Sequence, residues 1–370
     1  MEIYKNKHVW LILILLLAFH LNFTPHNDDQ YPVHVDEWVN YAISQAILDE
    51  GNVIYTEPFM GEKIITNDLE IGLRTFLAVF KDLTGFSWIF IFRYMPGIIF
   101  LITVLGVYIF ANRGGYGLQA AFLAALIPTS FRLIGPGFLV AVGVGLMFLP
   151  LSLFLAYNTK KYHVLFIFTA FLFLLHPPTA LAVIAVLIPF VLLNYRDGPK
   201  HSMYIAAALM FAFLISSPRL LHLVAPTAGS MVSTSTWFLP FAPTVFKVYG
   251  YLPTLMFVVG VFAMGWCGKI KDHGLIFASV LLLLPIVVFV QLYIGNGIIY
   301  DRNYSYLMVL MSIIGGFGLL SISTGLKKYR FGPVIYALLA ISILTTAAIA
   351  HSNIPYYHIM DEQEYRDYLW

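Results

Sequence analysis

The sequence has 370 residues, of which 60% are hydrophobic and only 11% are charged. A soluble domain carries roughly 25% charged residues, so this chain lacks the charge to cover a water-soluble surface and must place apolar surface in lipid. Its single cysteine, Cys267, excludes an intrachain disulfide, and the formal net charge of +2 becomes informative only when it is resolved by position.

Eleven apolar runs have the length or the sharp boundaries of membrane-spanning helices. The first follows Lys5 and Lys7 and lacks a small-residue cleavage site, so we expect a retained span rather than a signal peptide. Prolines separate closely joined helices, and His176, beside two of them, reads as a hydrogen-bonded break. The expected spans are residues 9–23, 87–111, 117–132, 136–157, 163–175, 178–194, 202–223, 250–267, 274–295, 304–324 and 333–350.

The charges sort these spans into an orientation. With the N-terminus inside, every inside segment holds a Lys or Arg, and these short segments hold 12 of the 21 basic residues. Cytoplasmic loops carry such an excess. The acidic residues do the opposite, since 16 of the 19 Asp and Glu fall outside. We therefore expect an all-α polytopic protein with its N-terminus inside and its C-terminus outside.

The first external loop, residues 24–86, holds 11 of those acidic residues and is far longer than most other turns. Long loops in compact proteins are usually functional or separately folded. Apolar residues recur at spacings of three and four over residues 38–48 and again over 69–80. This pattern predicts two amphipathic helices that lie along the membrane surface.

An acidic pair, Asp36 and Glu37, begins the first of these helices. Carboxylates in a first turn are stabilised by the helix dipole, so a solvated helix start is one interpretation. The other is a general base above a membrane cavity, because deprotonating a hydroxyl acceptor requires a carboxylate near the acceptor oxygen. His34, two residues earlier, would tune the pair.

The residues around this pair resemble a known family. The run from Val35 to Ala46 (VDEWVNYAISQA), followed by Gly51 and Pro58, is similar to the first-loop signature of the GT-C superfamily. These are polytopic glycosyltransferases that use polyprenyl-phosphate-linked sugars. The members that the run resembles are the protein O-mannosyltransferases and the lipid A aminoarabinose transferases.

Later segments extend the resemblance. Residues 67–72 (NDLEIG) are similar to the second half of that loop, and residues 301–307 (DRNYSYL) resemble the start of a late span. The tail is similar to the segment that joins the membrane part of archaeal members to an external domain. We therefore expect a transmembrane domain over residues 1–350 and an external tail over 351–370, at which a further soluble domain would begin.

The resemblance implies roles for the acidic pair. Carried onto this sequence, the usual catalytic candidate is Asp36. Glu37 would assist Asp36 or help hold a divalent cation, Mg²⁺ or Mn²⁺, because hard cations take carboxylate oxygens. A Trp, Trp38, follows the pair where relatives often have a smaller or polar residue, which would change the shape of the cavity.

A cation is expected as well, because a departing lipid phosphate develops negative charge. Arg302 is the first candidate, and the alternative is a local ion pair with Asp301 that anchors the span. Arg93 and Arg219 lie near the external ends of spans, where charges are often functional, although snorkelling also accommodates them. The remaining expected substrate contacts are Lys63, Asp68, Glu70, His34 and Tyr304.

Three functions remain open at this point. The first is a glycosyltransferase of the plasma membrane that moves a sugar from a polyprenyl-phosphate donor to a lipid, glycan or protein acceptor outside. The second is a transporter or lipid flippase, which the absence of acidic residues between Leu83 and Arg196 disfavours. The third is a non-catalytic scaffold of the same fold. No sequence feature points to nucleic acid.

Overall fold

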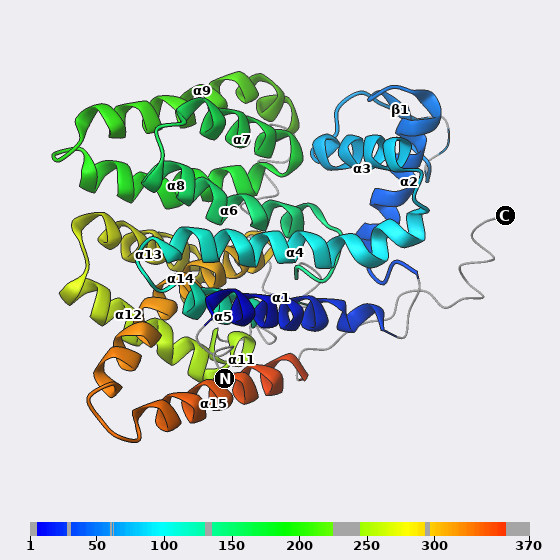
Figure 1. Cartoon of the computed structure of the whole chain (residues 1–370). Coiled ribbons are helices and arrows are strands. Elements are labelled where there is room, and N and C mark those ends of the chain that lie inside the picture. Colours follow the sequence, from blue (N-terminus) through cyan, green and yellow to red (C-terminus); the bar gives the residue numbers. More distant parts are fainter. Residues whose placement is uncertain are drawn as a thin grey trace.

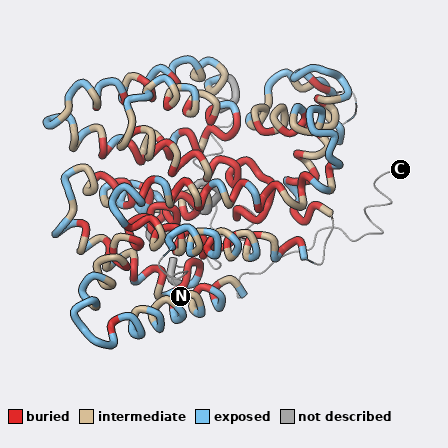
Figure 2. The backbone as a smooth tube through the Cα atoms, viewed as in Figure 1, coloured by how far each residue is buried: buried red, intermediate tan, exposed pale blue. Residues whose placement is uncertain are grey.

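A computed structural model describes residues 6–27, 31–59, 61, 63–129, 135–224, 245–292 and 297–352 of the chain. Most helices run side by side in one bundle, and a smaller group that contains α2 (Val35–Glu50), α3 (Ile71–Thr84) and β1 (Tyr55–Thr56) lies at one end of it (Figure 1). The residues buried in the middle of the bundle are covered by exposed apolar faces on its outer helices (Figure 2). Such faces require lipid.

The bundle is built from helices in chain order. They are α1 (Lys7–Phe23), α4 (Trp88–Asn112), α5 (Gly117–Ala125), α6 (Ala141–Asn158), α7 (Tyr162–Leu175), α8 (Pro177–Asn194), α9 (Pro199–Val224), α11 (Val245–Tyr249), α12 (Tyr251–Cys267), α13 (Ile270–Leu292), α14 (Gly297–Leu326) and α15 (Gly332–Ser352).

A helix overlaps each of the eleven expected ranges. Among the described residues, eight helices are long and apolar enough to cross a membrane, and α7 and α12 are shorter apolar helices. The all-α polytopic prediction is confirmed. One range is corrected, because in the expected span over 117–132 the helix α5 ends at Ala125 and the described residues 126–129 are not helical. Nine residues at 1.5 Å each rise about 14 Å, less than half of a bilayer core. The count of eleven and the orientation stay predictions.

The helix α14 forms the centre of the bundle. It packs against α12, α5 and α13, and it also touches α15, α6, α4 and α8. Its residues from Tyr304 to Ile314 are all buried. Small residues allow these close contacts, since a Cβ on Gly316 would lie 2.6 Å from the backbone of Ala120 in α5. The N-terminal end of α14, which carries Arg302, is thereby fixed relative to the other helices.

The long first loop folds as α2 (Val35–Glu50), a hairpin of β1 (Tyr55–Thr56) and β2 (Ile64–Ile65), and α3 (Ile71–Thr84). Both expected amphipathic helices are therefore present, and they pack on each other. Each ends at a glycine in the left-handed region, Gly51 with φ 61° and Gly85 with φ 68°. The α3 helix also packs against α7, which places the loop over the ends of the membrane helices.

Candidate active site

The acidic pair lies at the start of α2, as expected, and the local sequence explains why the helix begins there. His34 is the N-cap residue, and its Nδ1 accepts a hydrogen bond from the Asp36 N–H at 3.0 Å. The Asp36 side chain is 60% exposed, with a carboxylate oxygen 3.9 Å from His34 Nδ1. Asp36 therefore has a carboxylate open to an incoming group, held on an ordered helix start.

Glu37 points the other way and is fully buried. Its carboxylate accepts hydrogen bonds from the N–H groups of Leu139 at 2.7 Å, Val33 at 3.0 Å and His34 at 3.1 Å. Burial raises the pKa of Glu37 to about 8, against the opposing effect of these hydrogen bonds. The predicted role of Glu37 beside an acceptor or a metal does not fit this geometry, because its oxygens join the loop before α2 to the segment before α6.

A second set of charges lies at the start of α3. Asp68 accepts hydrogen bonds from the Arg74 guanidinium, from the Tyr55 hydroxyl at 3.2 Å and from the Glu70 N–H at 3.0 Å. Arg74 Nε also donates to the side chain of Asn40 in α2, at 3.3 Å. Burial lowers the pKa of Arg74, but the negative charges of Asp68 and Glu70 raise it by more, so the net shift of the pKa is upward. Asp68 is therefore a structural partner of Arg74, and Arg74 joins α3 to α2.

Glu70, the N-cap of α3, extends toward the membrane helices. One of its carboxylate oxygens lies 4.0 Å from Nε2 of His176, a fully buried residue between α7 and α8. Nδ1 of His176 is 2.6 Å from the Thr179 hydroxyl, which is 2.7 Å from the Tyr306 hydroxyl of α14. His176 therefore is a hydrogen-bonded break between helices, as expected, and it also connects the loop to the bundle core.

Glu70 lies within electrostatic range of both Asp36 and Arg302. Burial raises the pKa of Glu70, the charges of Arg74 and Arg302 lower it, and those of Asp36 and Asp68 raise it. A carboxyl group on which both Asp36 and Arg302 act lies within electrostatic range of each of them. Sequence positions 36, 70 and 302 are thus brought into one polar site between the starts of α2, α3 and α14.

Arg302 has unused hydrogen-bonding capacity in this site. Its Nε is buried and has no hydrogen-bond partner among the residues that the structure describes. A buried guanidinium donor without a partner is costly, and an anion such as a phosphate would satisfy it. The side chain of Asp301 lies outside the described residues, so the alternative of a local ion pair stays open.

Arg219 reaches the same region from α9. Its guanidinium donates to the backbone carbonyl groups of Asp68 and Leu69. It therefore holds the segment that leads into α3 and Glu70. As a predicted phosphate contact, Arg219 lies at the edge of the site, where its present role is to position the loop.

Other expected contacts lie elsewhere. Arg93 sits between α1 and α4, where it donates to the carbonyl of His26 at 3.3 Å and faces the ring of Phe23 at 5.6 Å. Lys63 is exposed in the hairpin turn, and Tyr304 is buried inside α14. The contacts described for Arg93 and Lys63 do not bring either of them to Glu70.

Some residues of the site were not anticipated from the sequence. Thr179 and Tyr306 complete the network around His176, and Asn40 and Tyr55 support Arg74 and Asp68. Helical spacing gave a usable signal for Tyr306, because it follows Arg302 by four residues and so shares its helix face. Thr179 follows His176 by three residues, and no comparable signal links Tyr55 to Asp68.

The expected metal also lacks a binding set. The part of the chain that the structure describes contains no group of three or more His, Cys, Asp or Glu side chains arranged to hold a metal ion. A pair formed by Asp36 and Glu37 does not fit, because the oxygens of Glu37 are taken by backbone N–H groups. The dependence on a divalent cation stays a prediction.

Comparison with known proteins identifies solved structures with a similar fold. No family model matches the chain, and no curated protein matches it. Two solved structures of ArnT from Cupriavidus metallidurans, an aminoarabinose transferase with the GT-C fold, do match it. The structure described as bound to undecaprenyl phosphate has a TM-score of 0.54 and 14% identity, over 92% of this chain and 70% of that one. The apo structure has a TM-score of 0.54 and 12% identity, over 93% of this chain and 74% of that one. The GT-C-like fold implied by the first-loop motif is confirmed.

Proposed function

We propose that this chain is a membrane glycosyltransferase that moves a sugar from a polyprenyl-phosphate donor to a hydroxyl group of an acceptor, outside the plasma membrane. The observation that carries the proposal is that a carboxylate, Asp36, and a cation, Arg302, both lie within electrostatic range of Glu70. The shared fold with an ArnT described as bound to undecaprenyl phosphate supports the class of donor.

In the proposed reaction, the acceptor oxygen attacks the anomeric carbon of the sugar. Asp36 takes the proton of the acceptor hydroxyl as that bond forms. The bond between the anomeric carbon and the phosphate oxygen breaks, and its electron pair leaves with the lipid phosphate. The negative charge that develops there is stabilised by Arg302, whose Nε has no other partner among the described residues.

The exposure of the two groups supports this division of labour. The Asp36 carboxylate is 60% exposed and so is open to an acceptor from the aqueous side. Arg302 lies at the start of the central helix, beside the buried network of His176 and Tyr306. A donor with its tail in the bilayer would present its phosphate at this level, between the two groups.

The test uses the full chain in vesicles that contain undecaprenyl-phosphate sugars, with a membrane extract as the source of acceptors. Formation of free undecaprenyl phosphate is measured, because every acceptor yields that product. Asp36→Asn should lower the rate by roughly 10²-fold or more. Asp82→Asn, at an exposed position in α3, should not change it. Equal rates in Asp36→Asn and the unaltered chain would contradict the proposal.

A further inference from the structure

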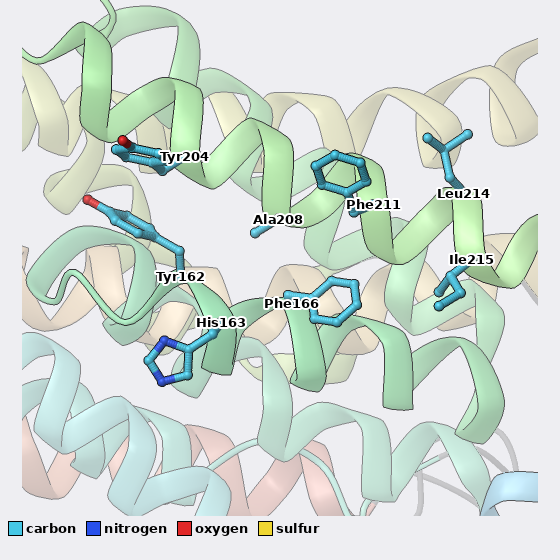
Figure 3. Close-up of a pocket in the computed structure, with 8 residues that line it drawn as sticks. All are labelled: Tyr162, His163, Phe166, Tyr204, Ala208, Phe211, Leu214 and Ile215. Carbon is cyan, nitrogen blue, oxygen red and sulfur yellow. The ribbon is translucent and has the colours of Figure 1, made fainter.

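An apolar groove lies on the outer surface of the bundle, between α7 and α9. It is an open groove of about 640 Å³, lined by Phe166 of α7 and by Ala208, Phe211 and Ile215 of α9, among others. Figure 3 shows these side chains along the groove, with Tyr162, His163 and Tyr204 at one end and Leu214 and Ile215 at the other. The groove is therefore apolar along its length and has polar groups at one end only.

The polar end is an ordered structure. Nε2 of His201 donates to the carbonyl of Ala156 at 2.8 Å, so its Nδ1 accepts from the Tyr162 hydroxyl at 2.7 Å. The rings of Tyr162 and Tyr204 stack with their centres 5.1 Å apart. Aromatic rings with a polar tip are typical of the interface between hydrocarbon and head groups.

The length of the groove matches one leaflet. From Tyr204 to Ile215 the helix advances eleven residues, about 16 Å at 1.5 Å per residue. Half of a hydrocarbon core is about 15 Å. A single lipid chain that enters at the tyrosine end would therefore lie in the groove down to the bilayer centre.

Basic residues lie close in sequence to the tyrosines of the polar end. Lys160 and Lys161 directly precede α7, and Lys200 is the second residue of α9, one turn before Tyr204 on the same helix face. All three are exposed. Residues 159–161 and 195–200 together carry four basic residues and one acidic residue, a net charge of +3. This end belongs to the side that the charge distribution predicts to be cytoplasmic.

We propose that this groove is a binding site for an anionic phospholipid of the inner leaflet. One acyl chain lies between α7 and α9, and the phosphate head group is bound by Lys160, Lys161 and Lys200. The charge complementarity at one end and the leaflet-length apolar lining favour this occupant over a second protein copy. The site lies at the opposite end of the helices from Asp36 and Glu70, so it does not depend on the proposed function.

The test is competition between dioleoyl phosphatidylglycerol and dioleoyl phosphatidylcholine for the full chain, measured as lipid retained in native mass spectrometry. The unaltered chain should retain one phosphatidylglycerol with roughly tenfold preference, which weakens as salt rises. Replacing Lys160, Lys161 and Lys200 by Gln should abolish the preference. Replacing Lys327, Lys328 and Arg330 by Gln removes the same charge from another predicted inner loop and should leave the preference unchanged.

Two outcomes would overturn the proposal. The first is equal retention of the two lipids by the unaltered chain, an arm that requires no variant to fold. The second is an equal loss of preference in both triple variants, which would indicate general attraction of a basic face to anionic lipid. Ala208→Leu adds a second check, because a larger side chain in the groove should lower retention while the three lysines stay in place.

Discussion

A carboxylate oxygen of Glu70 lies 4.0 Å from Nε2 of His176. This pair joins the long first loop to the junction of α7 and α8, and through Thr179 and Tyr306 to the central helix. The His176 Nε2 atom is buried and has no hydrogen-bond partner among the described residues. The candidate site therefore continues into the bundle as a buried polar network. A change at Glu70 will affect both the first loop and the junction of the membrane helices.

The protonation of Glu70 should make stability depend on pH. Burial raises its pKa, so folding favours the neutral carboxyl, and the stabilisation present at low pH is lost as the pH rises through the raised value. Glu70→Gln stays neutral. The thermal unfolding midpoint of this variant in detergent should therefore rise relative to that of the unaltered chain as the pH increases from 5 to 8.

The pKa of Glu37 is also raised, but Glu37 is present in both proteins. The difference between the two midpoints therefore reports on Glu70. The groups that face Glu70 are Asp36, Asp68, Arg74, His176 and Arg302. A difference between the two midpoints that is the same at pH 5 and pH 8 would show that Glu70 does not titrate in this range.

Replacing the buried Glu37 by Gln should destabilise the fold. The amide NH₂ of Gln cannot accept a hydrogen bond, so either the Leu139 N–H or the N–H groups of Val33 and His34 would lose their acceptor. An unsatisfied buried donor costs about 1–3 kcal/mol. The unfolding midpoint of Glu37→Gln should fall, and that of Asp82→Asn, a change at an exposed carboxylate, should not. Equal midpoints would remove the structural role given to Glu37.

Two glycines of α12 should respond differently to the same substitution. A Cβ on Gly260 would lie 2.0 Å from the carbonyl oxygen of Ile314 in α14, whereas a Cβ on Gly265 would meet nothing within 4 Å. Gly260→Ala should cost about 1–3 kcal/mol through forced separation of the helices. Gly265→Ala should be neutral or gain about 0.5–1 kcal/mol. Unfolding in detergent measures both, and equal midpoints would contradict the close packing of α12 on α14.

The sequence predicts most of this fold because lipid imposes a simple pattern. Apolar runs and the placement of lysine located a helix in every expected range, and the spacing of apolar residues located α2 and α3. The error at α5 arose because an apolar run reads alike whether it faces lipid or protein. The run around α5 is buried against α14 and α4 and stops before Pro128, which a pattern of hydrophobicity does not reveal.

The site was predicted only in outline. The motif located Asp36, Glu70 and Arg302, but it did not separate their roles from that of Glu37. The difference between Asp36 and Glu37 is one of direction, since neighbouring residues on a helix face about 100° apart and only one of them meets the backbone of Leu139. Contacts such as Tyr55 with Asp68 depend on how the hairpin returns to α3, which no local signal specifies.

The central claim is that Arg302 lies in a lipid-phosphate site beside Asp36, and the most direct test is binding of undecaprenyl phosphate to the purified full chain. Arg302→Gln should weaken binding by about tenfold or more, because a charge-assisted hydrogen bond contributes about 1.5–3 kcal/mol. Arg330→Gln removes an exposed charge in the turn between α14 and α15, beyond the far end of α14, and should leave binding unchanged. Equal binding by both variants and the unaltered chain would contradict the account.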